Sequence, residues 1–188
     1  MVNLTVCRKY HLPNRQRNIV ALVATLFVLI EYLPAPYPSI SLEIPQMYSQ
    51  LRSAGPGSVI ELPMGLRDGF GQVGMFDDRT MLYQMRHGHP LVGGFAARIP
   101  ESIRARYESL PVIRSLLRCS EPTGCEPVPE DQQMGKAEAA SALRSAGVRY
   151  VVIDRTRATT GLTAFVETML PLTLLASEGD RDLFELSE

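Results

Sequence analysis

Apolar positions form one long uninterrupted run near the start of the chain and shorter patterned segments after it. The run extends from Ile19 to Leu33, and Glu31 is its only charged residue. It follows a basic head, residues 1–17, that holds no acidic residue. A helix that crosses a bilayer needs about 20 apolar residues, with about 17 as the usual lower limit. The segment 18–33 is therefore close to the minimum length of a transmembrane helix.

Three interpretations of this run are open. A transmembrane helix with its basic end in the cytoplasm follows the positive-inside rule, and Tyr32 then marks the outer interface. A signal peptide also has a basic start and a short apolar core, although prolines crowd the cleavage region in "EYLPAPYPS". The third interpretation is a buried helix of a soluble protein. We expect a single-pass protein of the cell membrane with a cytoplasmic N-terminus, and the first two interpretations both place residues from about 34 onward outside the cytoplasm.

One pattern of helix, glycine and strand occurs twice after a proline-rich linker at residues 34–39. "SQLRSAGPGSVIEL" covers residues 49–62, and "SALRSAGVRYVVID" covers residues 141–154. Each predicts a short amphipathic helix that ends at Gly55 or Gly147 in the left-handed conformation, followed by a β-strand. The second strand is apolar on both faces, as in the centre of a sheet. We therefore expect two neighbouring strands of one sheet.

The rest of the chain predicts helices and an edge hairpin around that sheet. "TGLTAFVETMLP" has apolar residues at helical spacing and is stopped by Pro171, and "LTLLAS" and "DLFELS" flank a Gly-Asp turn. A helix from Glu101 to Arg118 is expected to break at Pro111. The predicted fold is α/β, with α+β as the alternative. A small mixed sheet of about four strands with packed helices forms an extracytoplasmic domain at residues 40–188, preceded by one N-terminal transmembrane helix.

The stretch "YQMRHGHPLVGGF" ends a further helix, which is expected from Asp78 to His87. Asp77 is a favourable N-cap, and Gly88 is a favourable left-handed residue at the C-terminal end. Apolar residues at helical spacing are expected to form the buried stripe of this helix. They are Met81, Leu82 and Met85.

The remaining face of this helix is the candidate site. Its residues recur at three- and four-residue spacing. They are Arg79, Tyr83, Arg86 and His87. With Arg98, which lies beyond a bend at Gly93 and Gly94, they form a patch suited to contact phosphate or sugar hydroxyls. The two glycines allow the backbone to approach a ligand or another segment closely.

Other chemistries have less support. His87 and His89 are two residues apart and zinc needs at least three protein ligands, so we expect no metal and no cofactor. No nucleophile elbow of the G-x-S-x-G kind is present. A net charge of −1 gives no electrostatic footprint for nucleic acid. Cys119 and Cys125 bracket "SEPTG", so they are either a disulfide of an oxidising compartment or two free thiols.

The order of these segments resembles a known group of enzymes. An apolar helix with a basic inner flank is followed by "LPAP", "QLRSAGPGSVIELPMG", "LYQMRHGHPLVGGFAARIP", "ALRSAGVRYVVIDR" and "RDLFELSE". Together they resemble the C-terminal extracytoplasmic domain, with the last transmembrane helix, of bacterial polytopic glycosyltransferases of the GT-C type. That group uses polyprenyl-phosphate sugars and includes relatives of the protein O-mannosyltransferases. The resemblance covers residues 18–188, and its most specific part is "YQxxHGxPLVGGF".

The resemblance implies a role in cell-envelope glycosylation without catalysis by this chain alone. In that group the catalytic acidic residue lies in the first outer loop, which has no counterpart in this sequence. The implied role is substrate binding or assembly beside a polytopic glycosyltransferase subunit and its polyprenyl-phosphate sugar. The patch around Arg86 and His87 would then face the membrane-side active site. A stand-alone extracytoplasmic binding or scaffold module, anchored or secreted, is the alternative.

Overall fold

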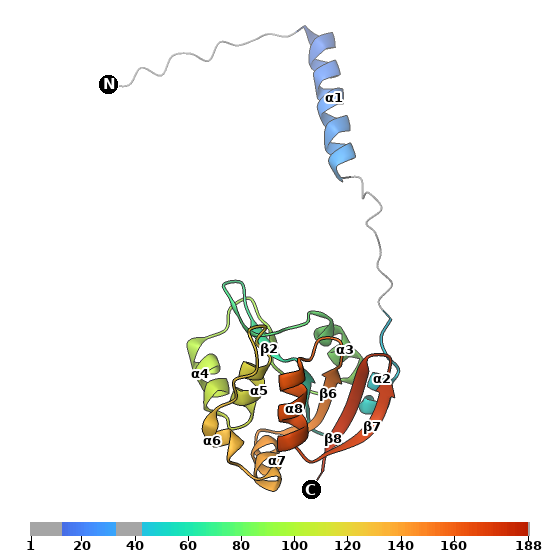
Figure 1. The fold of residues 1–188 in the computed structure, drawn as a ribbon. Helices are drawn as coiled ribbons and strands as arrows, with labels where there is room; N and C mark the ends of the chain where they lie inside the picture. The colour runs from blue at the N-terminus through green and yellow to red at the C-terminus, as the bar shows by residue number, and fades with distance from the viewer. Residues whose placement is uncertain (1–12, 33–42, 188) are drawn as a thin grey trace, which may run out of the picture. The chain divides into compact units, whose positions relative to one another are not determined.

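The structure is a computed structural model that describes residues 13–32 and 43–187. The chain divides into two compact units, Met1–Leu42 and Glu43–Glu188. In the first unit, helix α1 (Asn14–Tyr32) contains most of the apolar run (Figure 1). Among the residues described, no helix combines the length and the apolar character that a membrane crossing requires.

Part of the predicted organisation falls on residues outside the described ranges. The proline-rich linker predicted at residues 34–39 lies there, as does the basic head up to residue 12. The predicted extracytoplasmic domain begins close to the second unit, which is described from Glu43 onward.

The second unit mixes helices and strands (Figure 1). Its helices are α2 (Met47–Arg52), α3 (Arg79–His87), α4 (Glu101–Ser109), α5 (Ile113–Cys119), α6 (Pro129–Gln132), α7 (Lys136–Ser145) and α8 (Thr160–Met169). Its strands are β1 (Ser58–Leu62), β2 (Gly65–Arg67), β3 (Gln72–Gly74), β4 (Leu91–Val92), β5 (Gly94–Phe95), β6 (Val148–Asp154), β7 (Leu172–Glu178) and β8 (Arg181–Leu186).

The main sheet has five strands in the order β4-β1-β6-β8-β7. Strands β4, β1 and β6 are parallel, whereas β8 and β7 run antiparallel to their neighbours. Because β1 and β6 belong to the two repeated segments, the prediction that these strands are neighbours is confirmed. The edge hairpin is also confirmed, with Gly179 and Asp180 between its strands. The fold class is therefore a mixed α/β arrangement, with one strand more in this sheet than expected.

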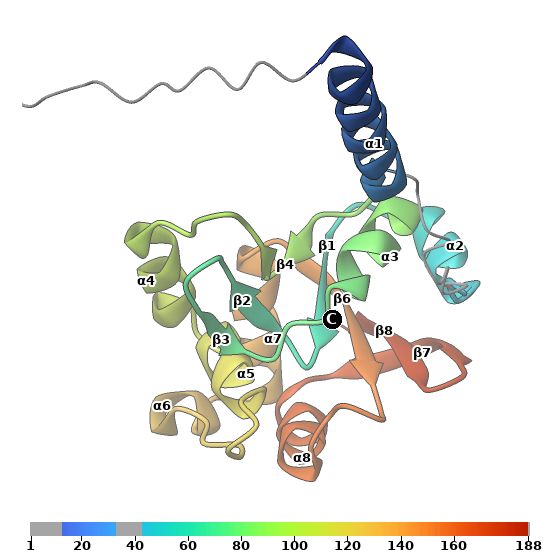
Figure 2. The same cartoon turned by 90° about the horizontal axis from the view of Figure 1, so that it is seen from above.

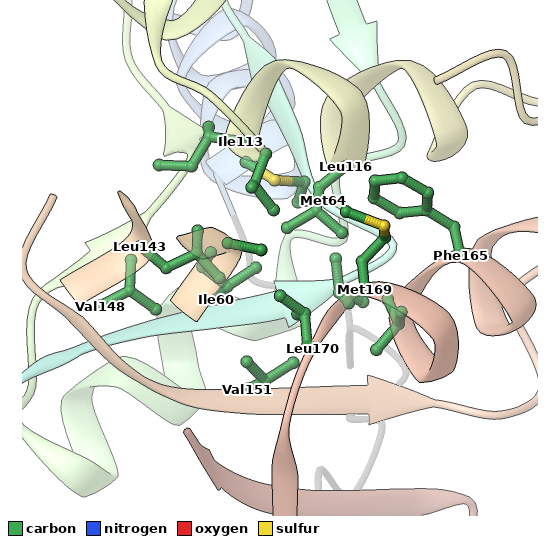
Figure 3. Packing of buried hydrophobic residues seen from close by; sticks show 14 of the residues in the cluster. Ile60, Met64, Ile113, Leu116, Leu143, Val148, Val151, Phe165, Met169 and Leu170 are labelled. Atoms are coloured by element: carbon green, nitrogen blue, oxygen red, sulfur yellow. The ribbon is translucent and has the colours of Figure 1, made fainter. Parts of the chain in front are cut away.

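Helices cover both faces of the main sheet, and the alternation of side chains along each strand explains how (Figure 2). From β6, Val151 and Ile153 join a cluster with α5, α7 and α8, whereas Tyr150 and Val152 join a cluster with α2 and α3. Figure 3 shows the first cluster, in which Leu143 of α7 packs near the sheet. Each fully buried large apolar side chain contributes about 1.5–3 kcal/mol relative to exposure. This two-sided burial is why "VRYVVID" is apolar in nearly every position.

A second sheet, in the order β3-β2-β5, was not expected from the sequence. Its strands have two or three residues each, which is too short for a periodic pattern to be recognised. Gly93 approaches it closely, because a Cβ atom at this position would lie 2.8 Å from the carbonyl oxygen of Gly65. Gly93 and Gly94 have φ values of 97° and 132°, which disfavour other residues. The close approach predicted for the Gly-Gly bend is therefore made to another backbone segment.

Several local predictions agree with the structure. Helix α4 ends at Ser109 and α5 begins at Ile113, so the break at Pro111 is confirmed. Gly88 and Gly147 have φ values of 74° and 85° after their helices, as a left-handed end requires. The buried residues of α8 are those of its predicted stripe, namely Leu162, Phe165, Val166 and Met169.

The predicted orientation of α3 was wrong. Met81, Leu82 and Met85 are exposed, and the exposed fraction of Met85 is 80%. The buried residues are instead Thr80, Tyr83 and His87. The rings of Tyr83 and His87 stack on Tyr48 of α2, and an aromatic pair contributes about 0.5–1.5 kcal/mol beyond the area that it buries.

The predicted left-handed conformation at Gly55 was also wrong. Helix α2 ends earlier, at Arg52, and Ser53 closes it in a right-handed conformation. Gly55 is not among the described residues with positive φ. A glycine is favoured at this position for a different reason. A Cβ atom there would lie 2.4 Å from Nη1 of Arg149 on β6.

Cys119 and Cys125 form a disulfide in the structure. Cys119 is fully buried at the end of α5. Cys125 packs against the first turn of α8, where a Cβ atom at Gly161 would lie 2.7 Å from Cβ of Cys125. The disulfide therefore holds the connecting loop between these two helices.

Candidate functional site

Three charged residues meet at one end of the main sheet because of strand register. Asp154, the last residue of β6, pairs with Arg181, the first residue of β8. Glu61 of β1 pairs with Val152, two residues before Asp154, and therefore lies on the same face. All three side chains are at least nine-tenths buried. They face the layer of α2 and α3, at the carboxyl ends of the parallel strands.

This end of the sheet is where open α/β folds bind ligands. The chain leaves β1 through β2 and β3 to reach α3 on one face, and it leaves β6 through α8 on the other face. The carboxyl ends of β1 and β6 therefore lie at a topological switch point, where the connections diverge and leave a crevice.

Arg181 holds the buried charges together. Its Nη2 atom donates to Oδ2 of Asp154 at 2.8 Å, and its Nη1 atom donates to Oε2 of Glu61 at 3.2 Å. The hydroxyl of Tyr48 also donates to Oε2 of Glu61, at 3.1 Å. The guanidinium lies over the ring of Tyr83, 4.7 Å from its centre, and that ring stacks on Tyr48 at 4.6 Å. Arg181 is thus fixed by ion pairs, hydrogen bonds and aromatic contact.

Burial changes the protonation of this cluster. It raises the pKa of Glu61 to about 8, although the charge of Arg181 opposes the change. Glu61 is therefore mostly neutral at pH 7. Burial also raises the pKa of Tyr48, and the neighbouring Glu61 adds to that increase. Oε1 of Glu61 has no hydrogen-bond partner among the described residues.

Asp77 joins this cluster to two more exposed arginines. Its Oδ1 atom accepts the backbone N–H of Arg79 at 3.0 Å, as a helix-capping residue does. The Nε atom of Arg79 lies 3.4 Å from the same oxygen. Nη1 of Arg157 lies 2.6 Å from Oδ2 of Asp77 without the alignment of a hydrogen bond. Burial acts to raise the pKa of Asp77, but the Arg79 N–H and the nearby guanidinium charges hold it below its usual value.

A cleft of about 620 Å³ opens over these groups. We call it the arginine cleft, because Arg79, Arg157 and Arg181 line it together with Tyr83 and Asp154. Its volume lies within the range of about 300–1,000 Å³ that is common for small-molecule sites. The remaining polar lining residues are Glu43, Gln46, Thr156, Glu178 and Asp180. Hydrogen-bond donors and acceptors therefore line the same opening.

A larger groove of about 750 Å³ lies beside α8 but offers less chemistry. Its lining is mainly apolar, with Arg155 and Lys136 among its charged groups. Arg155 is paired with Asp182, and Lys136 donates to the carbonyl oxygen of Glu167. Its cations are thus engaged within the fold, and the arginine cleft is the better candidate.

The predicted patch is divided by the structure. Arg79 lines the arginine cleft, and Tyr83 lies in its wall with an exposed fraction of 3%. Arg86 is exposed, and its Nε atom donates to Oγ of Ser49 at 2.8 Å. Arg98 is exposed in the loop after β5 and does not line the cleft. The five predicted residues therefore do not share one surface.

His87, the last predicted residue, is a buried part of the core. Its Nδ1 atom accepts the backbone N–H of His89 at 3.0 Å, and its Nε2 atom has no partner among the described residues. Burial lowers the pKa of His87 to about 4, and the neighbouring His89 adds to the decrease. The ring nitrogens of His89 lie 2.9 Å from the Gly57 carbonyl oxygen and 2.8 Å from that of Leu51. Both histidines thus fasten the loop after α3 to the fold.

Sequence reasoning missed Glu61, Asp154, Arg157 and Arg181. The available signal was a charged residue within, or directly after, a buried apolar strand, as in "SVIEL" and "VRYVVID". Charged residues are seldom buried unless they are paired, so such positions are candidates for a buried cluster. The pairing across strands follows only from the sheet order.

The described residues contain no group of three or more histidine, cysteine, aspartate or glutamate side chains placed to hold a metal ion. Comparison with known proteins adds no assignment. No family model, no curated protein and no solved structure matches the chain.

Proposed function

We propose that this chain is a membrane-anchored extracytoplasmic domain of a glycosyltransferase-like protein. It binds a polar substrate, or assists assembly, in cell-envelope glycosylation, and it does not catalyse transfer alone. Residues 18–33 anchor it in the membrane as a single span with the N-terminus in the cytoplasm. A polytopic glycosyltransferase subunit with a polyprenyl-phosphate sugar is its expected partner.

The observation that carries the binding role is the arginine cleft. Carboxylates and guanidinium groups line it together, and the hydroxyl groups of a sugar both donate and accept hydrogen bonds. The cleft also lies at the switch point of the sheet, where ligands of α/β domains are expected. No serine or cysteine is among its described lining residues, and the hydroxyl of Thr156 donates to Asp154, a carboxylate that is already paired with Arg181. We therefore propose binding and not covalent catalysis.

Two further observations support the location. Helix α1 carries large exposed apolar side chains, among them Leu22 at 70% and Phe27 at 72% exposed. Such a surface favours contact with lipid or with other apolar helices. The disulfide between Cys119 and Cys125 fits an oxidising compartment outside the cytoplasm.

The test is genetic complementation. In cells that lack this chain we expect loss of an envelope glycan, and the full-length chain should restore it from the membrane fraction. A variant with Leu22→Arg and Phe27→Arg in α1 should move to the soluble fraction and restore less. An unchanged glycan profile in cells without the chain would refute the proposed role.

The same experiment separates the alternative of a stand-alone binding or scaffold module. The arginine cleft is compatible with either role, because binding does not require a transferase partner. If the soluble variant restores the glycan fully, the module acts without an anchor, and the stand-alone function is favoured.

A further inference from the structure

The charges around the arginine cleft narrow the class of ligand. Three arginines and four carboxylate residues line it, so an anion is favoured only where guanidinium groups locally outnumber carboxylates. The distances between the charged groups show where this occurs. Asp154 neutralises Arg181 at 2.8 Å, whereas Arg79 and Arg157 both approach the carboxylate of Asp77, which also lies 3.7 Å from Arg181. Among the described residues, this leaves one positive charge in excess at the Arg79–Arg157 side.

Donors are also in excess on that side. Each guanidinium has five N–H donors in a planar fork. Arg79 uses its Nε atom toward Asp77, and Arg157 only approaches Asp77 without a well-aligned hydrogen bond. Arg79 and Arg157 are partly exposed, with side-chain fractions of 56% and 26%. Two neighbouring forks can therefore bind a group with two acceptor oxygens and one negative charge.

The turn between β7 and β8 adds acceptors to the lining of the cleft. Asp180 is exposed in the turn between β7 and β8, and Glu178 precedes it. One oxygen of Glu178 accepts the backbone N–H of Met47 at 2.8 Å. Carboxylates in these positions accept hydrogen bonds from hydroxyl groups. A ligand that reaches from the arginines to this turn needs an anionic end and a hydroxylated body.

We propose that the arginine cleft binds an acidic sugar with a single negative charge, held by Arg79 and Arg157 and contacted at its hydroxyl groups by Asp180 and Glu178. This inference rests on the proposed function and adds the class of ligand. The charge is carried by a carboxylate, as in a hexuronic acid. A phosphate monoester, with nearly two charges at pH 7, exceeds the one positive charge in excess.

The first test is calorimetric titration of the full-length chain at pH 7 and low salt. Glucuronic acid should bind, whereas methyl glucoside, which has no charge, and acetate, which has no hydroxyl groups, should bind about tenfold more weakly or worse. Equal affinity for glucuronic acid and methyl glucoside, or no binding of any acidic sugar, would overturn the proposal. A glucose methyl phosphodiester serves as a control with the same charge on a different group, and tighter binding of it than of glucuronic acid would overturn the assignment of the charge to a carboxylate.

Variants locate the site. Arg157→Gln should weaken glucuronic acid binding at least about tenfold, because a charge-assisted hydrogen bond is lost. Arg79→Gln provides the same test at a more exposed position, where folding is less at risk. Asp180→Ala should reduce the affinity for glucuronic acid toward that for acetate. Arg98→Gln is the matched control outside the cleft and should bind as the unmodified chain does.

A loss of affinity in Arg98→Gln equal to that in Arg157→Gln would overturn the placement in the cleft. The binding measurement is independent of the complementation experiment, because it requires no glycosyl transfer. If the chain restores the glycan but binds no acidic sugar, the ligand class is wrong and the proposed function stands. If it binds acidic sugars but the glycan is unaffected, the proposed function is wrong and the site stands.

Discussion

Two buried titratable residues on the α2/α3 face, His87 and Glu61, make the folding stability depend on pH in opposite directions. Both are almost completely buried, with exposed fractions of 2% and 4%. Burial keeps both side chains neutral. A neutral histidine becomes charged when the pH falls, whereas a neutral carboxylic acid becomes charged when the pH rises. Their contributions can therefore be separated by substitution.

For His87, stability should fall as the pH falls. Its pKa is about 4 in the fold and 6.5 in the unfolded chain, so the unfolded state takes up the proton first. The contribution is complete above pH 6.5 and is lost between pH 6.5 and 4, by about 3 kcal/mol. Urea unfolding of the unmodified chain and of His87→Gln at pH 7, 5.5 and 4.5 measures it. A stability difference between the two proteins that does not vary with pH would contradict the burial of a neutral imidazole.

For Glu61, stability should fall as the pH rises. Its pKa is about 8 in the fold and 4.5 in the unfolded chain, so its contribution is complete below pH 4.5 and lost toward pH 8. The loss is on the order of 5 kcal/mol. Relative to the unmodified chain, Glu61→Gln should therefore become more stable as the pH rises from 5 to 8. If Glu61→Gln instead becomes relatively less stable over this range, the carboxylate is ionised in the fold and paired with Arg181.

At the scale of residues, the sequence indicates which side chains are unusual but not which ones meet. Glu61 and Asp154 stand out as charges in apolar strands, and Arg79 was recognised on its helix face. Their common site depends on β1 lying beside β6 and on Arg181 pairing with Asp154 across β8. The contacts of Arg181 with Asp154 and with Glu61 join positions 27 and 120 residues apart, and no local pattern encodes that register.

At the scale of elements, α3 shows where hydrophobic patterning fails. The helix exposes Met85 and buries Tyr83 and His87, although methionine is the more apolar residue. The reason is tertiary, since Tyr48 and Arg181 offer these rings a stacking partner and a cation. Hydrophobic patterning succeeded where the local sequence signals are strong. Helix α8 has a continuous apolar stripe and a stop at Pro171, and both were predictable.

The orientation of α3 can be tested by a pair of substitutions. Tyr83→Ala should destabilise the domain by about 3 kcal/mol or more, because a large buried ring is removed. Met85→Lys should change the stability by less than about 0.5 kcal/mol, because the side chain is exposed. Chemical unfolding of both variants gives the comparison. The reverse order of the two effects would restore the methionine stripe as the buried face.

At the scale of the whole molecule, the chain consists of two units that divide between Leu42 and Glu43. The clusters on both faces of the main sheet, and the arginine cleft, draw all of their residues from the second unit. The proline-rich linker predicted at residues 34–39 lies outside the described residues. The described residues that line the cleft thus all belong to one unit.

Removing residues 1–42 should therefore leave the unfolding of the second unit unchanged. We expect the free energy of unfolding to differ by less than about 0.5 kcal/mol from that of the full chain, since no core residue is lost. Thermal and urea unfolding of the two proteins measure the difference. A clearly less stable shortened chain would show that the first unit contributes to the fold.

The central claim is that the arginine cleft is the ligand site, and a crystal structure of the full-length chain with glucuronic acid tests it most directly. The predicted result places the sugar carboxylate within hydrogen-bond distance of Arg79 and Arg157, and the sugar hydroxyls toward Asp180. Ordered sugar bound only elsewhere, for example beside Arg86 and Arg98, would contradict the account.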